Sequence, residues 1–253
     1  MVTKITYFPV FNPAHVAAQE GTGTLLTYND LRDLNNQFEK ANPQMILEWV
    51  GETYGRRAAV VTSLQPTGIV TLHMMQTIGM DIPVLTLDTD VLFPETYELI
   101  EQVEKVFDIT IERIKPEKAL YTEYQDKPIL WETDREICCQ LRKVQPLNNA
   151  LAPYDAWIAG LRRDQSPTRA NTDIVSWDMK RNMAKICPLA TWTEEMVWDY
   201  IKANKLPYNK LHDQGYPSIG CMPCTQPANG SKDLRAGRWV GMDKTECGIH
   251  LQK

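Results

Sequence analysis

The sequence lacks an apolar run long enough to cross a membrane. A membrane helix needs about 18 or more consecutive apolar residues, and no segment of the 253-residue chain approaches that length. The N-terminal segment contains Pro9 and Pro13 and has no apolar signal core, which argues against secretion. We therefore expect a cytoplasmic protein, whose six cysteines are reduced thiols unless a metal or catalysis uses them.

An excess of positive charge is absent as well. The chain has 27 Lys and Arg against 32 Asp and Glu, for a net charge of −5, which argues against binding nucleic acid through bulk electrostatics. Internal repeats and low-complexity tracts are also missing. Hydrophobic residues make up 43% and charged residues 23%, as in an ordinary globular protein with a sizeable core.

Short apolar runs alternate with amphipathic segments along most of the chain. Strands are predicted at residues 58–63, 83–88, 108–113 and 156–160, and helices at 28–55 (divided by Pro43), at 68–78, from 94 onward and at 191–204. This alternation predicts an α/β fold, with a mostly parallel sheet and helices on both faces. We assign residues 1–57 to an N-terminal arm and helices, 58–206 to the α/β domain, and 207–253 to a functional C-terminal segment packed on that domain.

Four of the six cysteines form two close pairs. Cys138 and Cys139 are adjacent in a segment whose composition suits a helix, and Cys221 and Cys224 form a CxxC in a turn-like stretch. Four thiolates from two distant segments are the ligand set of a four-iron cluster or of tetrahedral zinc. The adjacent pair favours the cluster, because two successive thiolates reach one small zinc ion only with strain. Structural zinc and unmetallated cysteines are the alternatives.

The other two cysteines differ from each other in their surroundings. Cys187 lies between apolar residues and is expected to be a core thiol. Cys247 lies in a polar segment near the C-terminus, with Lys244 and His250 close to it in sequence. Such neighbours lower the pKa of a thiol and favour the thiolate, so Cys247 is a candidate nucleophile; an exposed tail thiol is the alternative.

Polar segments follow the predicted strands. Thr62–Gly68 joins the first strand to a helix, a placement that suits an anion, although an ordinary strand-to-helix turn has the same pattern. No GxxxxGK[ST] motif is present, so a Walker-type NTPase is not supported. Arg162, Arg163 and Arg169 follow the fourth strand and suit either an anionic ligand or a solvated basic loop. Ligands of open parallel sheets bind where the strands end, so we expect these segments to meet.

Five motifs, in this order, resemble the family of APS/PAPS reductases, which act on adenylyl sulfate (APS) or its 3′-phosphorylated form (PAPS). They are Cys138-Cys139 with Arg142-Lys143, Gly160–Arg169, Pro217–Thr225, Arg235–Trp239 and Lys244–His250, and the match runs from about Ala58 to the end. The resemblance implies an adenine nucleotide α-hydrolase-like fold, with residues 58–206 as the nucleotide-binding domain. It also implies sulfate assimilation with thioredoxin or glutaredoxin as reductant, and a homo-oligomer. In members with both cysteine pairs it implies a [4Fe-4S] cluster and a preference for APS.

The same resemblance assigns roles to individual residues. It implies that Cys247 is the nucleophile, that the four paired cysteines hold the cluster, and that the substrate is bound by Ser63, Asp88, Lys143, Arg163, Arg235 and Arg238. Two positions depart from the family pattern and bear on the nucleotide contacts: Asp90 stands where glycine is common, and the first loop contains Pro66. The alternative functions are a PAPS reductase, or a nucleotide-binding protein that carries a metal or cluster without catalysis.

Overall fold

The fold is built around a six-stranded sheet in the part of the chain that the structure describes. A computed structural model describes residues 26–117, 130–228, 230–231, 233–241, 246 and 248–250. The strand order is β3-β2-β1-β4-β6-β5. The strands are β1 (Ala58–Val61), β2 (Val84–Leu87), β3 (Ile111–Ile114), β4 (Ala156–Ala159), β5 (Val175–Asp178) and β6 (Met183–Ile186). All neighbours pair in parallel except β5, which is antiparallel to β6 at one edge.

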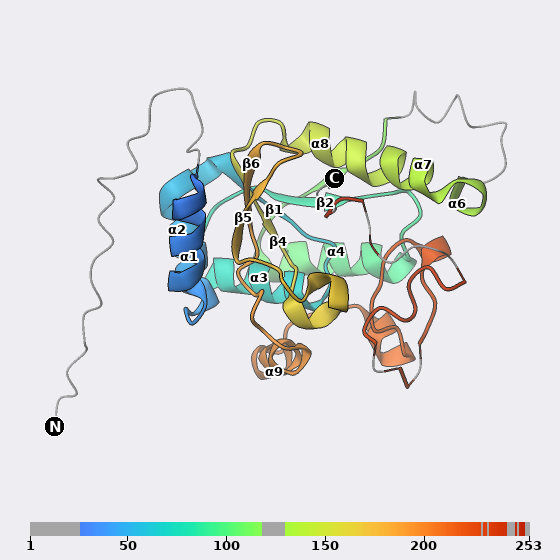
Figure 1. The fold of residues 1–253 in the computed structure, drawn as a ribbon. Helices are drawn as coiled ribbons and strands as arrows, with labels where there is room; N and C mark the ends of the chain where they lie inside the picture. Colours follow the sequence, from blue (N-terminus) through green and yellow to red (C-terminus); the bar gives the residue numbers. More distant parts are fainter. Residues whose placement is uncertain are drawn as a thin grey trace.

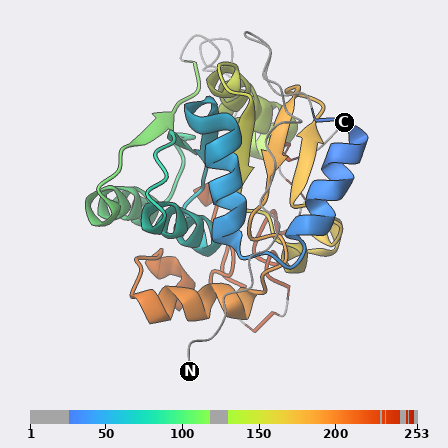
Figure 2. The ribbon, with the colours of Figure 1, turned by 90° about the vertical axis from the view of Figure 1, so that its left-hand side faces the viewer.

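Helices cover both faces of the sheet (Figure 1). On one face lie α3 (Pro66–Thr77) and α4 (Pro94–Phe107), and on the other lie α6 (Leu130–Thr133), α7 (Arg135–Cys139), the π-helical turn η3 (Gln140–Val144) and α8 (Gln145–Leu151). The helix α9 (Glu194–Asn204) packs against α3, α2 (Pro43–Tyr54) contacts α3 and β1, and α1 (Tyr28–Phe38) lies beside β5 (Figure 2). The predicted α/β fold is thus confirmed.

Local sequence sets the starts of several helices. Thr27 caps α1 and exchanges hydrogen bonds with Asp30 in a capping box, and Thr193 caps α9 through the backbone N–H of Met196. The helices α2, α3 and α4 each begin with a proline, whose fixed φ suits the first helical position.

The structure corrects three details of the predicted elements. The third strand starts at Ile111 instead of residue 108, because Asp108 adopts a left-handed conformation (φ 53°) that ends α4. The helix after β1 starts at Pro66, two residues earlier than predicted. The strand β6 and the edge strand β5 were not predicted, since polar residues interrupt their four-residue runs.

The segment after Leu206 packs against the ends of β1 and β2. Leu92 and Cys221 form an isolated antiparallel bridge, and the N–H of Met222 donates to the carbonyl of Val91 at 2.8 Å. This segment is the orange-red part of the ribbon beside α4 and α7 (Figure 1). Within the described residues, the structure has no helix of the length and apolar character needed to span a membrane.

The last described residues return to the centre of the sheet. The ring of His250 lies parallel to that of Trp157 on β4, with the ring centroids 5.8 Å apart, and Arg181 donates to the carbonyl of Ile249 at 3.3 Å. Burial, and then the nearby cations led by Lys185, hold the pKa of His250 well below its usual value. The folded protein therefore keeps this imidazole neutral.

Gly68 is expected to be required for the close approach of α3 to the turn after β1. A Cβ at this position would clash with the hydroxyl oxygen of Thr62, which is buried and accepts from the N–H of Leu64. The substitution Gly68→Ala should lower the free energy of unfolding by about 1–3 kcal/mol, measured by urea denaturation. Gly51→Ala is the control: its Cβ would have its nearest neighbour at 3.9 Å within α2, so this variant should be as stable as the parent or more so. Equal stability of the two variants would contradict the clash.

The neutral His250 predicts a loss of stability in acid. Unfolding restores the pKa of this imidazole to about 6.5, so below that pH the unfolded chain binds a proton that the folded chain does not. The free energy of unfolding should therefore be insensitive to His250 above pH ~7 and fall by up to about 1.4 kcal/mol per pH unit below ~6.5.

A His250→Phe variant retains an aromatic ring over Trp157 and loses the titrating group. The histidines His73 and His212, whose pKa values are also lowered by burial, stay in both proteins. The difference between the two urea-unfolding profiles from pH 7.5 to 5 thus isolates His250. Parallel profiles would show that the folded state does not hold this imidazole neutral.

Candidate functional site

The described pocket with the most convergent polar groups lies where the central strands end. The strands β1 and β4 are neighbours in the sheet, but the chain leaves β1 toward α3 on one face and reaches β4 from α8 on the other. Such a reversal opens a crevice at the carboxyl ends of the strands. The pocket is lined by residues 61–63, 65–68, 87, 89 and 92 from the first half of the sheet, by Lys143, 160–162, 165, 169 and 194, and by 217–221, 234, 235, 238, 239, 246, 249 and 250 of the C-terminal segment.

The first turn of α3 forms one wall of this pocket. The hydroxyl of Thr62 accepts from the N–H of Leu64, whose φ of 53° bends the chain toward the helix. Within the described residues, no side chain caps α3, and the Gln65 side chain instead accepts from the N–H of Ile219 at 2.9 Å. The positive end of the helix therefore faces the pocket beside Ser63, where it favours an anion.

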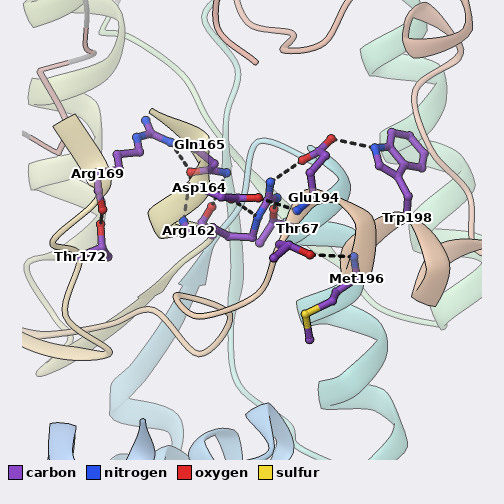
Figure 3. A network of polar contacts seen from close by, with 11 residues as sticks. Thr67, Arg162, Asp164, Gln165, Arg169, Thr172, Glu194, Met196 and Trp198 are labelled. Atoms are coloured by element: carbon purple, nitrogen blue, oxygen red, sulfur yellow. Dashed lines mark hydrogen bonds and ion pairs between the residues drawn. The ribbon is translucent and has the colours of Figure 1, made fainter. Parts of the chain in front are cut away.

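Two adjacent arginines after β4 point to different places. Arg162 lines the pocket and is 2% exposed, with its guanidinium bonded to Thr67, Asp164 and Glu194 (Figure 3). Arg163, expected to bind substrate, lies outside the pocket lining. Its guanidinium bonds to both carboxylate oxygens of Glu39 (2.5 and 2.9 Å). The backbone is extended at Arg162 and enters the 3₁₀ turn η4 (Arg163–Gln165) at the next residue, so the two side chains point in different directions.

Asp88, which was expected to bind the substrate, instead pairs with side chains of the protein. Its carboxylate is 2% exposed, accepts from the Tyr97 hydroxyl at 2.7 Å and lies 3.4 Å from Lys115 Nζ; it is not part of the pocket lining. Burial, with Asp88 as the next cause, raises the pKa of Tyr97 to about 12. Asp90 has a φ of 59°, the region that favours glycine, which explains why glycine suits this position.

The remaining predicted substrate residues meet in the pocket. Lys143 reaches it from the π-helical turn η3, and π-helical turns occur often at functional sites. Arg235 and Arg238 reach it from the C-terminal segment, both over the ring of Trp239. The guanidinium of Arg238 also occupies the space that a side chain at Gly220 would fill, so the glycine admits this cation to the pocket.

A carboxylate from the C-terminal segment bridges two of the pocket arginines. Glu246 accepts from two nitrogens of Arg169, both at 2.8 Å, and from Arg235 at 3.0 Å. All three side chains are 9–13% exposed. Cys247, the expected nucleophile, lies outside the described residues, but Glu246 before it and Ile249 and His250 after it line the pocket.

The paired cysteines lie at the end of the pocket near Lys143. Cys138, Cys139 and Cys221 are buried and Cys224 is half-buried; Cys221 Sγ lies 3.2 Å from the Thr89 hydroxyl. Burial raises the pKa of Cys138, the cation of Arg142 lowers it, and the nearby Cys221 and Cys224 raise it further. The two pairs thus share one electrostatic environment. As placed, no three His, Cys, Asp or Glu side chains of the described ranges could hold a metal ion.

Cys187 is the sixth cysteine, and its expected place in the core is confirmed. Its side chain is 1% exposed and packs within the main hydrophobic cluster, where burial raises its pKa. A buried thiol of this kind is a poor nucleophile.

Sequence reasoning did not assign several residues of the pocket. Glu194 and Glu246 received no role, Thr67 was included only as part of the Thr62–Gly68 turn that suits an anion, and Arg162 and Arg169 were placed only in a general basic cluster. The sequence indicated Arg162 and Arg169 only through the grouping of basic residues after the fourth predicted strand. No sequence signal distinguished Glu194 from other acidic residues that favour the first turn of a helix.

Comparison with known sequences identifies relatives over most of the chain. The family model described as "Phosphoadenosine phosphosulfate reductase domain" matches residues 57–227. The Adenosine 5′-phosphosulfate reductase of Halalkalibacterium halodurans is 44% identical over 225 residues, covering 87% of this chain and 96% of that protein. The protein of the same name from Staphylococcus haemolyticus is 49% identical over 209 residues (81% and 86%), and Adenosine 5′-phosphosulfate reductase 2 of Bacillus subtilis is 44% identical over 235 residues (91% and 99%).

Solved structures agree with this assignment. The phosphoadenylyl-sulfate (PAPS) reductase of Candida auris, solved as a phosphate complex, superposes with a TM-score of 0.69 at 29% identity, covering 78% of this chain and 96% of that one. The FMN adenylyltransferase of Candida glabrata shares the fold alone, with a TM-score of 0.57 at 12% identity, covering 84% and 69%. The extent of the sequence match, together with the pocket at the ends of the central strands, shows that the chain belongs to the phosphoadenosine phosphosulfate reductase family.

Proposed function

We propose that this protein reduces adenylyl sulfate to sulfite and AMP in sulfate assimilation, with thioredoxin as the electron donor. The observation that carries the proposal is the pocket, where the positive end of α3, the side chains of one lysine and four arginines, and residues on both sides of Cys247 in sequence meet. APS carries a phosphate and a sulfate joined through one oxygen, so its binding requires several cations within a short distance. The relatives named Adenosine 5′-phosphosulfate reductase match along nearly the whole chain, which supports APS as the substrate.

The nucleotide phosphate would lie against the first turn of α3, near Ser63. Backbone N–H groups at a helix N-terminus bind such a group without a counter-ion from solvent. Lys143, Arg235 and Arg238 would contact the sulfate and phosphate oxygens, and their charges would be strengthened by the low dielectric of a closed pocket.

The reaction that we assign to Cys247 is a sulfonate transfer. The thiolate attacks the sulfur of APS, a new S–S bond forms, and the S–O bond to the phosphate breaks, with its electron pair leaving on AMP. The product on the enzyme is Cys247–S–SO₃⁻. A thioredoxin thiolate then attacks the Cys247 sulfur and releases sulfite, and the second thioredoxin thiol resolves the mixed disulfide and frees Cys247. Thioredoxin thus supplies both electrons.

The cations of the pocket would stabilise charge that develops during the transfer. Negative charge grows on the phosphate oxygens of AMP as the S–O bond breaks, and fixed donors aimed at those oxygens lower the barrier without reorganising. Arg235 and Arg238 lie twelve and nine residues before Cys247 in the same C-terminal segment, so the cations and the nucleophile would come together when this segment covers the pocket.

We propose a [4Fe-4S] cluster as the cofactor, because four cysteine thiolates are the donor set that such a cluster takes. Their soft sulfur donors come from two separate segments, share one mostly buried environment and are surrounded by the cations of Arg142, Lys143 and Arg238. Thiolates beside cations are the donors that such clusters require. When bound, the cluster would polarise the side of the pocket that Lys143 occupies. Cys138, Cys139, Cys221 and Cys224 would hold it.

PAPS is the second candidate substrate, because the similar protein from Candida auris is a PAPS reductase. An anaerobic assay of sulfite release from APS and from PAPS, with reduced thioredoxin, decides between them. We expect turnover to be selective for APS. Faster turnover of PAPS would reverse the assignment, and turnover of neither substrate would support a binding protein without catalysis.

Cys247→Ser should abolish sulfite release and leave AMP binding intact, because the hydroxyl is a weak nucleophile and reduces nothing. Incubation with APS in the absence of thioredoxin, followed by mass spectrometry, should show one SO₃ group added to the peptide containing Cys247 in the parent and none in the variant. Cys187→Ser is the matched control: its thiol is buried in the core, so the variant should acquire the SO₃ group as the parent does. Labelling elsewhere in the parent would disprove the assigned nucleophile.

The cluster proposal predicts the metal content of the anaerobically purified protein. We expect roughly four irons and matching acid-labile sulfide per chain. Cys138→Ser should lower both, while Cys187→Ser should retain them, since Cys187 directly follows β6 and lies in the hydrophobic core. Zinc in place of iron, or equal iron in the two variants, would contradict the proposed ligands.

A further inference from the structure

Arg162 lies in the pocket, but its guanidinium is bonded within the protein. Nε donates to Asp164 at 3.0 Å, one terminal nitrogen donates to the Thr67 hydroxyl and the other to the Glu194 carboxylate (Figure 3). The side chain is only 2% exposed, and two carboxylates balance its charge. The charge of a buried cation that is paired in this way is already compensated, so no ligand anion is required to balance it.

The hydrogen bonds continue from Arg162 into α9. The second oxygen of Glu194 accepts from the indole Nε1 of Trp198 at 2.7 Å, and the backbone N–H of Glu194 donates to Asp164 at 2.5 Å. The first bond restricts the Glu194 carboxylate, and the second restricts the Asp164 carboxylate; the two carboxylates in turn orient the guanidinium. Trp198 contributes to this arrangement without lining the pocket.

The Thr67 hydroxyl accepts a hydrogen bond from Arg162. Its own proton remains available for donation to another group. Thr67 is the second residue of α3, is 1% exposed and lines the pocket. A hydroxyl carries one donor and two acceptor sites, and Arg162 occupies an acceptor site. Among the residues that the structure describes, none accepts a hydrogen bond from this hydroxyl.

We propose that the Thr67 hydroxyl donates a hydrogen bond to the phosphate of the bound nucleotide, and that Arg162, Glu194 and Trp198 are positioning residues that orient it. The Arg162 guanidinium polarises the Thr67 hydroxyl and occupies one of its lone pairs. The O–H bond must therefore point away from the guanidinium, toward the N-terminus of α3. Arg162 therefore acts on the ligand through Thr67. The inference rests on the nucleotide site of the proposed function.

The central test compares Thr67→Val with Thr67→Ser. Valine retains the shape of the side chain and removes the hydroxyl, while serine retains the hydroxyl and removes the methyl group. Because the lost hydrogen bond would reach a charged phosphate, the dissociation constant for AMP, measured by calorimetry, should rise about ten- to a hundredfold in Thr67→Val. In Thr67→Ser it should stay within about threefold of the parent, the size of a weak neutral contact.

Adenosine is the second probe, because it lacks the phosphate. A loss confined to AMP is the expected result, since a general loosening of the pocket would weaken adenosine equally. Wild-type affinity for AMP in Thr67→Val, or an equal loss in the serine variant, would overturn the role of the hydroxyl.

Trp198→Phe tests the positioning residues from outside the pocket. It removes the indole donor to Glu194, and we expect AMP affinity to fall about two- to fivefold, the size of one indirect hydrogen bond. Trp192→Phe is the matched control, because Trp192 packs on the neighbouring Tyr200 and takes no part in this set of bonds. Equal affinities in the two tryptophan variants would overturn the positioning by α9. Absence of AMP binding in the parent would instead refute the proposed nucleotide site.

Discussion

The parallel pairing of β1 with β4 is the constraint on which the site depends. Val60 pairs with Val84 of β2 on one side and with Ile158 of β4 on the other, and the three strands end at the same edge. The chain leaves β1 toward α3 on one face and reaches β4 from α8 on the other, and such a reversal opens a crevice at the carboxyl ends of the strands. The pocket segments 62–68 and 160–165 follow the ends of β1 and β4, and Ile219 of the C-terminal segment is bonded to Gln65 beside them. The apolar core of the sheet thereby fixes the positions of polar groups that do not contribute to it.

The crevice can hold several cations because nearby carboxylates compensate the charges of the arginines. Arg162 is neutralised by Asp164 and Glu194, and Arg169 and Arg235 share Glu246. Removing one partner of such a buried pair costs several kcal/mol, so each arginine is tied to its carboxylate in the structure described. The two sets of ion pairs differ in the part of the chain that supplies the carboxylates. Arg162 is bonded to carboxylates of the α/β domain, whereas the partner of Arg169 and Arg235 belongs to the C-terminal segment, next to Cys247. Binding of an anionic ligand by Arg169 or Arg235 is therefore linked to the position of the segment that carries the nucleophile.

Much of the fold could be predicted because its central strands are short, apolar and bounded by turn residues. The runs at β1, β2 and β4 are buried on both faces and contain no charged residue, which is typical of a parallel sheet. The strand β6, which lies between β4 and the edge strand β5, is different: it includes Lys185, which is 6% exposed and lies over the ring of Trp157 at 5.2 Å. A lysine in a four-residue run argues against a buried strand, and only the tertiary contact with an aromatic ring makes its burial acceptable.

The directions of individual side chains in the site could not be predicted from the sequence. The spacing of the cysteines indicated a shared ligand set, and the family resemblance assigned the arginines near the C-terminus to the substrate. The sequence could not decide between Arg162 and Arg163, because the backbone changes from extended at Arg162 to a 3₁₀ turn at Arg163, and no sequence pattern shows where this change falls. Glu39, at the end of α1, gives Arg163 a partner on the outside, and Asp164 with Glu194 gives Arg162 one on the inside. The direction of each arginine is thus set by carboxylates up to 124 residues away in sequence, which only the folded chain brings together.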